Sequence, residues 1–199
     1  MEIGFCLAPE RGDADRLLAG VAETLVAQGL RVCGIVQVNT LHPDRSRCDM
    51  DIAVLPRGPV IRISQTLGAG AGACRLDAGA LETAVALVAA SLDRGADVLI
   101  LNKFGKQEAV GRGFHGLIAE AVAQGVPVLL RVNHRNMPAF QAFSAGFATA
   151  LAPDAGQMIA WLDHIRRGRG PGDLRRTCRL PAGQGAALAG GRGPSSGMR

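Results

Sequence analysis

The sequence DVLILNKFGKQEAVGRGFHGLIAEAVAQGVPVLLRV, residues 97–132, decides the fold class. It begins with the apolar run Val98–Leu101, which is typical of a buried strand. A loop rich in glycine and charge follows at 102–113, and then a segment with apolar residues at helical spacing, which Gly125 ends. Val126–Val132 is a second apolar run. A strand, a helix and another strand joined by short connections form the unit from which parallel sheets are built.

The same alternation continues on both sides of this unit. Apolar runs predict strands at residues 3–8 and 32–38. Four helices are expected to begin beside residues whose side chains can cap them, namely Asp13, Asp77, Asn136 and Asp154. The order of elements predicts a three-layer α/β fold with a mostly parallel sheet flanked by helices.

Residues 50–64 interrupt this alternation. Two short apolar runs, at 52–55 and 60–63, lie on either side of Pro56-Arg57-Gly58-Pro59. Proline and glycine at this spacing indicate a tight turn. The pattern therefore predicts a small β-hairpin inserted into the sheet.

Charge and composition divide the chain into an α/β domain, residues 1–167, and a basic tail rich in Gly, Pro and Arg, residues 168–199, which is expected to be disordered. Residues 166–199 hold eight arginines and one acid, Asp173, for a net charge of +7. Since the whole chain carries +5, residues 1–165 carry −2. The domain thus lacks a basic face, which argues against a nucleic-acid partner. An RGG-like tail is the alternative, but no aromatic residues are interleaved with its arginines.

Cysteine usage and hydropathy bear on the compartment. The five cysteines are an odd number, widely spaced and without zinc-ligand spacing, so they do not resemble a secreted disulfide framework. No apolar run approaches the roughly 18 residues that span a membrane, and no signal segment is evident. The sequence predicts a protein of the reducing cytoplasm with no membrane partner. It leaves the oligomeric state open, a homo-oligomer included.

One block of sequence resembles a known family. NKFGKQE at residues 102–108, continuing as GRGF at 111–114, is similar to a signature of an uncharacterised bacterial family. That family is nucleoside-triphosphatase-like and is often encoded beside molybdate-transport genes. The likeness extends over roughly residues 1–152. It implies a fold like that of P-loop NTPases and a genomic setting, without implying a reaction.

Both Walker motifs are degenerate in this chain. The loop APERGD at residues 8–13 has one glycine, no lysine and no hydroxyl, and it places Glu10 and Asp13 where a phosphate would bind. The strand at 98–101 is followed by Asn102-Lys103, whereas the related nucleoside triphosphatases that this block resembles carry acidic residues there. Both the Mg²⁺ ligand and the candidate base are therefore missing. We expect no nucleotide hydrolysis.

The loop at 102–113 is the best candidate ligand site. Its polar members are Asn102, Lys103, Lys106, Glu108 and Arg112. Glycines that expose backbone N–H groups, cationic side chains and a following helix N-terminus all favour an anion. Asn133 and Arg135 follow the next strand, and in a parallel sheet the two loops can be neighbours. The alternative is a solvated rim in which Lys106 and Glu108 merely pair.

Two further cysteines could carry chemistry. Cys48 and Cys74 lie on either side of the predicted hairpin, and each is preceded or followed by an arginine that would lower a thiol pKa. They could form a redox pair or bind a soft metal. The alternative is two unrelated thiols, because sequence does not show whether they meet.

Two functions from different classes follow. The first is an accessory protein that binds an oxyanion or a nucleotide without turning it over, in molybdenum homeostasis if the resemblance holds. The second is a nucleoside triphosphatase or phosphotransferase with a rebuilt site that uses Glu108 or a thiol. The sequence favours the first, a protein that is not an enzyme, and it names no cofactor or resident metal.

Overall fold

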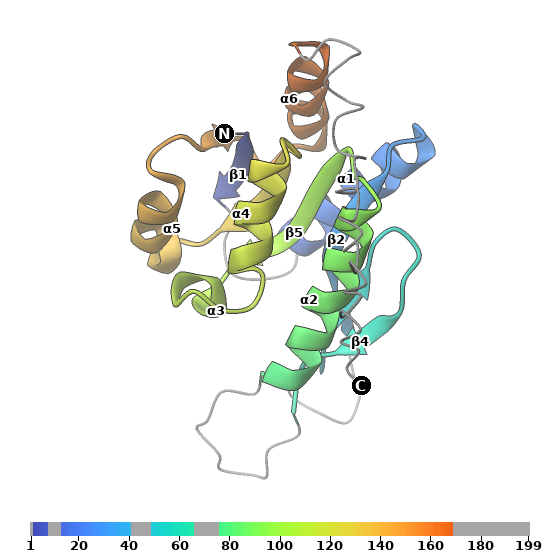
Figure 1. The fold of residues 1–199 in the computed structure, drawn as a ribbon, viewed down its shortest axis with the longest axis vertical. Coiled ribbons are helices and arrows are strands. Elements are labelled where there is room, and N and C mark those ends of the chain that lie inside the picture. Colours follow the sequence, from blue (N-terminus) through green and yellow to red (C-terminus); the bar gives the residue numbers. More distant parts are fainter. Residues whose placement is uncertain (1, 8–12, 41–48, 66–75, 169–199) are drawn as a thin grey trace, which may run out of the picture.

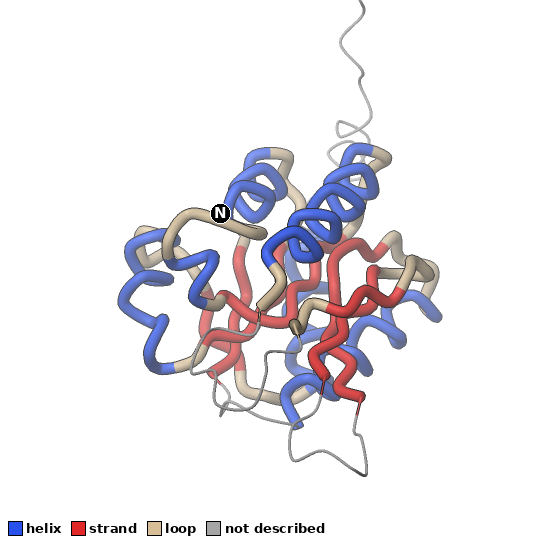
Figure 2. Tube along the Cα trace, turned by 90° about the horizontal axis from the view of Figure 1, so that it is seen from below, coloured by secondary structure: helices blue, strands red, loops and turns tan. Residues whose placement is uncertain are grey.

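The structure is a computed structural model, and it describes residues 2–7, 13–40, 49–65 and 76–168. Within these ranges it has three layers, with a central sheet and helices on both faces (Figures 1 and 2). The strands are β1 (Ile3–Leu7), β2 (Val32–Thr40), β3 (Asp49–Val54), β4 (Val60–Arg62), β5 (Val98–Phe104), β6 (Val128–Val132) and β7 (Thr149–Leu151). The helices are α1 (Asp13–Ala27), α2 (Ala78–Asp93), α3 (Lys106–Ala109), α4 (His115–Ala123), α5 (Met137–Ser144) and α6 (Ala155–Gly168), with a 3₁₀ turn η1 (His134–Asn136).

The sheet is mostly parallel, which confirms the predicted fold class. Its strand order among the described residues is β4-β3-β2-β5-β6-β1-β7. The strands from β2 to β7 in that order run parallel, whereas β3 and β4 run antiparallel at one end of the sheet. Ile35 is opposite Val54, and Ile52 is opposite Ile61. The predicted β-hairpin is therefore confirmed as an extension of the parallel sheet at its β2 edge.

Each face of the sheet has its own hydrophobic core, and helices cover both. Leu18 and Leu25 of α1 and Leu162 of α6 are buried against one face. Helices α2, α4 and α5 cover the other face with, among others, Val88 and Phe140. Because both faces are covered, β5 and β6 are almost wholly buried and most of their residues are apolar, as in central strands of parallel sheets.

Capping residues set most helix starts where the sequence predicts them. Asp77 Oδ1 accepts a hydrogen bond from the Ala80 N–H at 3.0 Å at the start of α2. Asp154 does the same for α6, where its Oδ1 accepts from the Gln157 N–H at 2.8 Å. Helix α5 also begins directly after its predicted cap, Asn136, but the side chain of that residue makes no capping hydrogen bond, and the η1 turn precedes the helix.

Three features differ from the prediction. Strand β5 continues to Phe104, three residues beyond the predicted end, and the short helix α3 lies inside the predicted loop. Strand β7 has three residues with little burial, so it lacks the apolar run that reveals the other strands. Helix α6 ends at Gly168, one residue past the predicted boundary of the domain, and residues 169–199 lie outside the described part.

Candidate ligand-binding site

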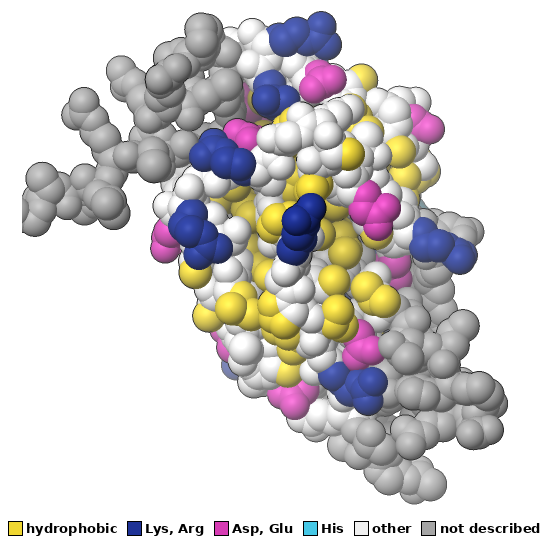
Figure 3. Space-filling view, turned by 90° about the vertical axis from the view of Figure 1, so that its right-hand side faces the viewer, with side chains coloured by type: hydrophobic (Ala, Val, Ile, Leu, Met, Phe, Trp, Pro, Cys, Tyr) yellow, Lys and Arg dark blue, Asp and Glu magenta, His cyan; other side chains and the backbone are white. Residues whose placement is uncertain are grey.

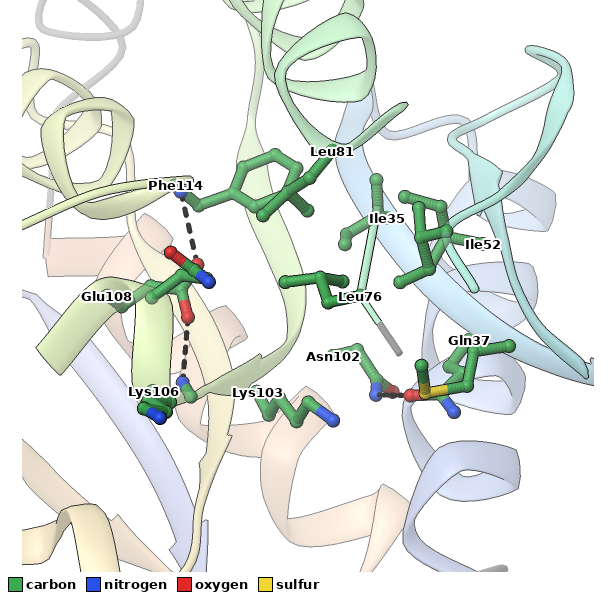
Figure 4. Close-up of a pocket in the computed structure, with 14 residues that line it drawn as sticks. Ile35, Gln37, Ile52, Leu76, Leu81, Asn102, Lys103, Lys106, Glu108 and Phe114 are labelled. Atoms are coloured by element: carbon green, nitrogen blue, oxygen red, sulfur yellow. Dashed lines mark hydrogen bonds between the residues drawn. The ribbon is translucent and has the colours of Figure 1, made fainter. Parts of the chain in front are cut away.

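A cavity of about 230 Å³ lies at the carboxyl ends of β2 and β5, between the sheet, α2 and the segment after β5 (Figure 4). Its walls are mostly apolar: Ile35, Met50, Ile52, Ile63, Leu76, Leu81 and Phe114. Its polar members are Gln37, Asn102, Lys103, Lys106, Gln107 and Glu108. The carboxyl edge of a parallel sheet is where such folds bind ligands. Four of the predicted site residues are therefore gathered around one cavity.

Asn102 lies in an irregular stretch of β5. Leu101 is opposite Leu130 of β6, and Phe104 is opposite Val132, so β5 contains one residue more than its partner between these pairs. An extra residue of this kind is a β-bulge, which turns neighbouring side chains to new directions. The bulge explains why the predicted strand end at Leu101 is wrong. It also lets Asn102 line the cavity together with Ile35 and Gln37 of β2.

The Asn102 amide is buried and only half of it is paired. Its side chain is 3% exposed, and its Nδ2 donates to Gln37 Oε1 at 2.9 Å. Its Oδ1 is buried and has no hydrogen-bond partner among the described residues. A buried carbonyl oxygen without a partner costs free energy, so such groups often mark places where a ligand or water binds.

Glu108 holds the segment after β5 in place. Its carboxylate is buried and accepts two backbone hydrogen bonds, from Gly105 N–H to Oε2 at 2.8 Å and from Phe114 N–H to Oε1 at 3.1 Å (Figure 4). Gly113 has φ +56°, and a Cβ there would lie 2.7 Å from Glu108 Oε1. The glycine at 113 therefore makes room for the carboxylate.

This arrangement corrects one part of the sequence interpretation. Gly105 and Gly111 were expected to leave N–H groups uncovered for an anion. The Gly105 N–H donates to the Glu108 carboxylate, and the Gly111 N–H donates to the Glu108 backbone carbonyl at 3.1 Å. Both donors are used within the loop, so backbone N–H groups at these two positions are not available to a ligand.

The predicted cationic residues do not all lie together. Lys103 and Lys106 are exposed and line the cavity. Arg112 is also exposed but is not one of the lining residues. An anionic group at the cavity mouth would therefore meet the two lysines first.

The end of β6 lies beside this loop, as adjacent strands require. Asn136 Nδ2 donates to the Phe104 carbonyl at 3.3 Å. Asn133 Oδ1 accepts from the Asn136 N–H at 2.9 Å and thereby caps η1. Arg135 is exposed on the same turn. Neither Asn133 nor Arg135 lines the cavity, so these two residues form a neighbouring part of the edge.

A buried ion pair, which the sequence analysis missed, joins β6 to the first turn of α1. Arg131 Nη2 lies 3.1 Å from Asp15 Oδ1, and both side chains are less than a tenth exposed. The sequence contains one indication of this ion pair, which is the charged residue Arg131 inside the apolar run of β6. Burial raises the pKa of the nearby Cys6 thiol, and the charge of Arg131 lowers it by less.

Several other predictions concern residues without a described environment. Cys48 and Cys74 lie outside the described residues, and so do residues 8–12 of the degenerate Walker A loop. Cys6 and Cys33 are described and buried, and burial raises the pKa of Cys33 to about 12. A raised pKa disfavours the thiolate, which is the reactive form, so burial works against a nucleophilic role for both thiols.

The described ranges contain neither a cluster of metal ligands nor a membrane-spanning helix. No group of three or more His, Cys, Asp or Glu side chains there could hold a metal ion. Among the same residues, no helix has the length and apolar character needed to cross a membrane. On the face shown in Figure 3, basic side chains are scattered among acidic and apolar ones, and they form no continuous basic surface there.

Two solved structures share the fold of this chain. The solution structure of a human cancer-related nucleoside triphosphatase superposes with a TM-score of 0.57 at 16% identity, covering 84% of this chain and 98% of that one. The crystal structure of THEP1 from the hyperthermophile Aquifex aeolicus gives 0.55 at 18% identity, covering 83% and 96%. At these identities the likeness shows the fold alone, a mostly parallel sheet flanked by helices.

A relative found by sequence has a higher identity to this chain than these two structures. The molybdenum import ATP-binding protein ModC 2 of Bradyrhizobium diazoefficiens is 40% identical over 149 residues, 75% of this chain. The matched region is 17% of that protein, so the chain spans a small part of its relative. Residues 3–161 match the family described as "Protein of unknown function (DUF2478)". The chain therefore belongs to the DUF2478 family.

Proposed function

We propose that the protein is an accessory protein that binds an anion or a nucleotide without hydrolysing it, and that it serves molybdenum import. The observation that carries the first half is the amide at the end of β5. Asn102 and Gln37 are hydrogen-bonded to each other where a hydrolysing enzyme would need a carboxylate for Mg²⁺. Without that carboxylate the site can hold a ligand but cannot position the metal for phosphoryl transfer.

The charges around the cavity favour an anion. Lys103 and Lys106 line it, and Arg112 and Arg135 are exposed on the two neighbouring loops. Charge-assisted hydrogen bonds from such groups to oxyanions are about twice as strong as neutral ones. Glu108 lines the same cavity, but its buried carboxylate accepts two backbone N–H groups, whose dipoles offset part of its negative charge.

The link to molybdenum rests on the relative. A region similar to this chain is part of a molybdenum import ATP-binding protein, of which it makes up 17%. Regions joined on one polypeptide commonly serve one process. In this chain the matching domain has no GxxxxGK[ST] loop, so we infer that the shared region contributes a task other than ATP hydrolysis to import.

The proposal is tested by two measurements on the purified protein. Phosphate release from ATP and GTP with Mg²⁺ should not exceed the blank. Thermal shift with molybdate, sulfate, phosphate and nucleotides should identify a ligand whose binding weakens about tenfold in Lys106→Ala, the loss of one charge-assisted bond. Arg57→Ala, on the exposed turn of the hairpin, is the matched control and should bind normally. Equal binding by wild type, Lys106→Ala and Arg112→Ala would place the site elsewhere.

The second candidate is a nucleoside triphosphatase or phosphotransferase with a rebuilt site. The fold shared with the human nucleoside triphosphatase favours it. Glu108, one base considered for it, would have to give up two backbone hydrogen bonds to act. Mg²⁺-dependent phosphate release that Lys106→Ala abolishes would establish this function and refute the first.

A further inference from the structure

The geometry points to the cavity beside Asn102 as the binding site of a nitrogen heterocycle that carries an amino or N–H donor. The heterocycle is joined to an anionic group, and Lys103 and Lys106 bind this group. The inference rests on the proposed function for the anionic group. It adds the heterocyclic ring, its hydrogen-bond donor and the residue, Asn102, that accepts the hydrogen bond from that donor.

The walls of the cavity suit a flat apolar body. Leu81 and Phe114 approach it from the helix side, whereas Ile35 and Ile52 approach it from the sheet (Figure 4). A bare oxyanion such as molybdate or phosphate would gain nothing from such walls, because it is strongly hydrated and makes only polar contacts. A ring would remove apolar surface from water on both of its faces.

The unpaired oxygen of Asn102 selects for a donor. Asn102 is one of the lining residues, and its Oδ1 is buried and accepts no hydrogen bond from the described residues. An oxyanion without protons carries only acceptors, and it would be repelled by this oxygen. A ring N–H or exocyclic amino group would satisfy the oxygen, and a ligand without one would leave it buried and unpaired.

The size of the cavity limits what enters it. About 230 Å³ is below the roughly 300–1,000 Å³ of sites that enclose a drug-sized ligand. One ring system fits, and the remainder of the ligand must lie outside. Lys103 and Lys106 are the exposed cations that line the cavity, so they would meet a charged group attached to the ring. A purine nucleoside monophosphate has this combination of parts.

Calorimetry with AMP and GMP as probes tests the inference on the full chain. At least one of them should bind. Purine riboside 5′-monophosphate, which is AMP without its amino group, should bind about tenfold more weakly than AMP if AMP is the ligand that binds. Asn102→Leu should weaken the binding of the amino-bearing nucleotide about tenfold. The effects of removing the amino group and of Asn102→Leu should not add, because both remove the same hydrogen bond.

A second variant covers the case in which Asn102→Leu fails to fold. Ile63→Phe places a larger side chain into the cavity and should block the ring while the melting temperature stays near that of wild type. Arg57→Ala is again the control that should change nothing. Asn102→Leu should melt near the wild-type temperature, because the gain from removing a buried oxygen that has no partner offsets the loss of the hydrogen bond from Nδ2 to Gln37.

The outcomes separate this inference from the proposed function. If molybdate or phosphate binds and no nucleotide does, the proposed function stands and the heterocycle is refuted. If a nucleotide binds equally well to wild type, Asn102→Leu and Ile63→Phe, the ring lies elsewhere and the inference fails. If Asn102→Leu weakens the nucleotide but Lys103→Ala and Lys106→Ala do not, the ring site is supported and the anion contact of the proposed function is refuted.

Discussion

At the scale of single residues, the buried carboxylate of Glu108 organises the site more than any exposed charge does. It accepts hydrogen bonds from two backbone N–H groups, one three residues before it and one six residues after it, and so closes the segment between Gly105 and Phe114. Of the two lysines that line the cavity, Lys103 lies two residues before this segment and Lys106 lies within it. Their placement therefore depends on a residue that need not touch the ligand.

The corresponding prediction is that Glu108→Gln destabilises the protein. An amide keeps one acceptor but introduces a donor against a backbone N–H, so one charge-assisted hydrogen bond is lost. We expect the free energy of unfolding to fall by about 1–3 kcal/mol in urea denaturation. Glu82→Gln makes the same change on an exposed position of α2 and should stay within about 0.5 kcal/mol of wild type.

Equal stability of the two variants would show that the carboxylate does not hold the loop.

The positions of Asn102, Lys103, Lys106 and Glu108 at one strand end could be predicted from sequence, because charged and glycine residues directly after an apolar run mark a loop. The role of Glu108 could not. Its backbone partners lie three residues before it and six after it, and only the folded loop brings them to its carboxylate. The pairing of Asn102 with Gln37 also depends on contact between β2 and β5, whose residues are 65 positions apart.

At the scale of elements, the pairing of β2 with β5 requires glycine at position 34. This residue has φ +123°, and a Cβ on it would lie 1.8 Å from the carbonyl oxygen of Ile100. Only glycine fits there without moving one strand away from the other. Gly34 thus belongs to the pairing of the two strands that carry Gln37 and Asn102.

We therefore expect Gly34→Ala to lower the free energy of unfolding by about 3 kcal/mol or more, because it combines a steric clash with a strained backbone. Gly20→Ala is the matched control. Gly20 lies within α1 with nothing within 4 Å of its would-be Cβ, and alanine there should raise stability by about 0.5–1 kcal/mol. Opposite signs for the two variants in thermal or urea denaturation are the expected result, and a stable Gly34→Ala protein would contradict it.

Elements with a clear apolar pattern could be predicted from the sequence, whereas short or irregular elements could not. The hairpin was evident because a Pro-Gly turn separates two apolar runs. The β-bulge could not be predicted, because the extra residue in β5 is defined only by the register between β5 and its partner β6, which the sequence does not show. Strand β7 is short and poorly buried, and its pairing with β1 supplies the hydrogen bonds that define it.

At the scale of the whole molecule, the described domain closes with α6. Met158 and Leu162 of this helix are buried in the core that it shares with α1. The sequence beyond Gly168 shows no periodic apolar face that could extend this core.

A chain truncated after Gly168 should therefore keep the melting temperature of the full chain in calorimetry. A chain truncated before Ala155 loses Met158 and Leu162 and should fail to fold cooperatively. If the first truncation lowers the melting temperature clearly, residues 169–199 stabilise the domain.

The place of β1 in the sheet also governs the order in which the protein can assemble during synthesis. Of the described strands, β1 is translated first, yet its two neighbours are β6 and β7, which end at Val132 and Leu151. Strands β2 to β5 can pair with one another as soon as Phe104 has emerged. Strand β1, which is apolar, therefore stays unpaired until most of the domain has been translated. During that interval we expect it to be the segment that a chaperone protects most.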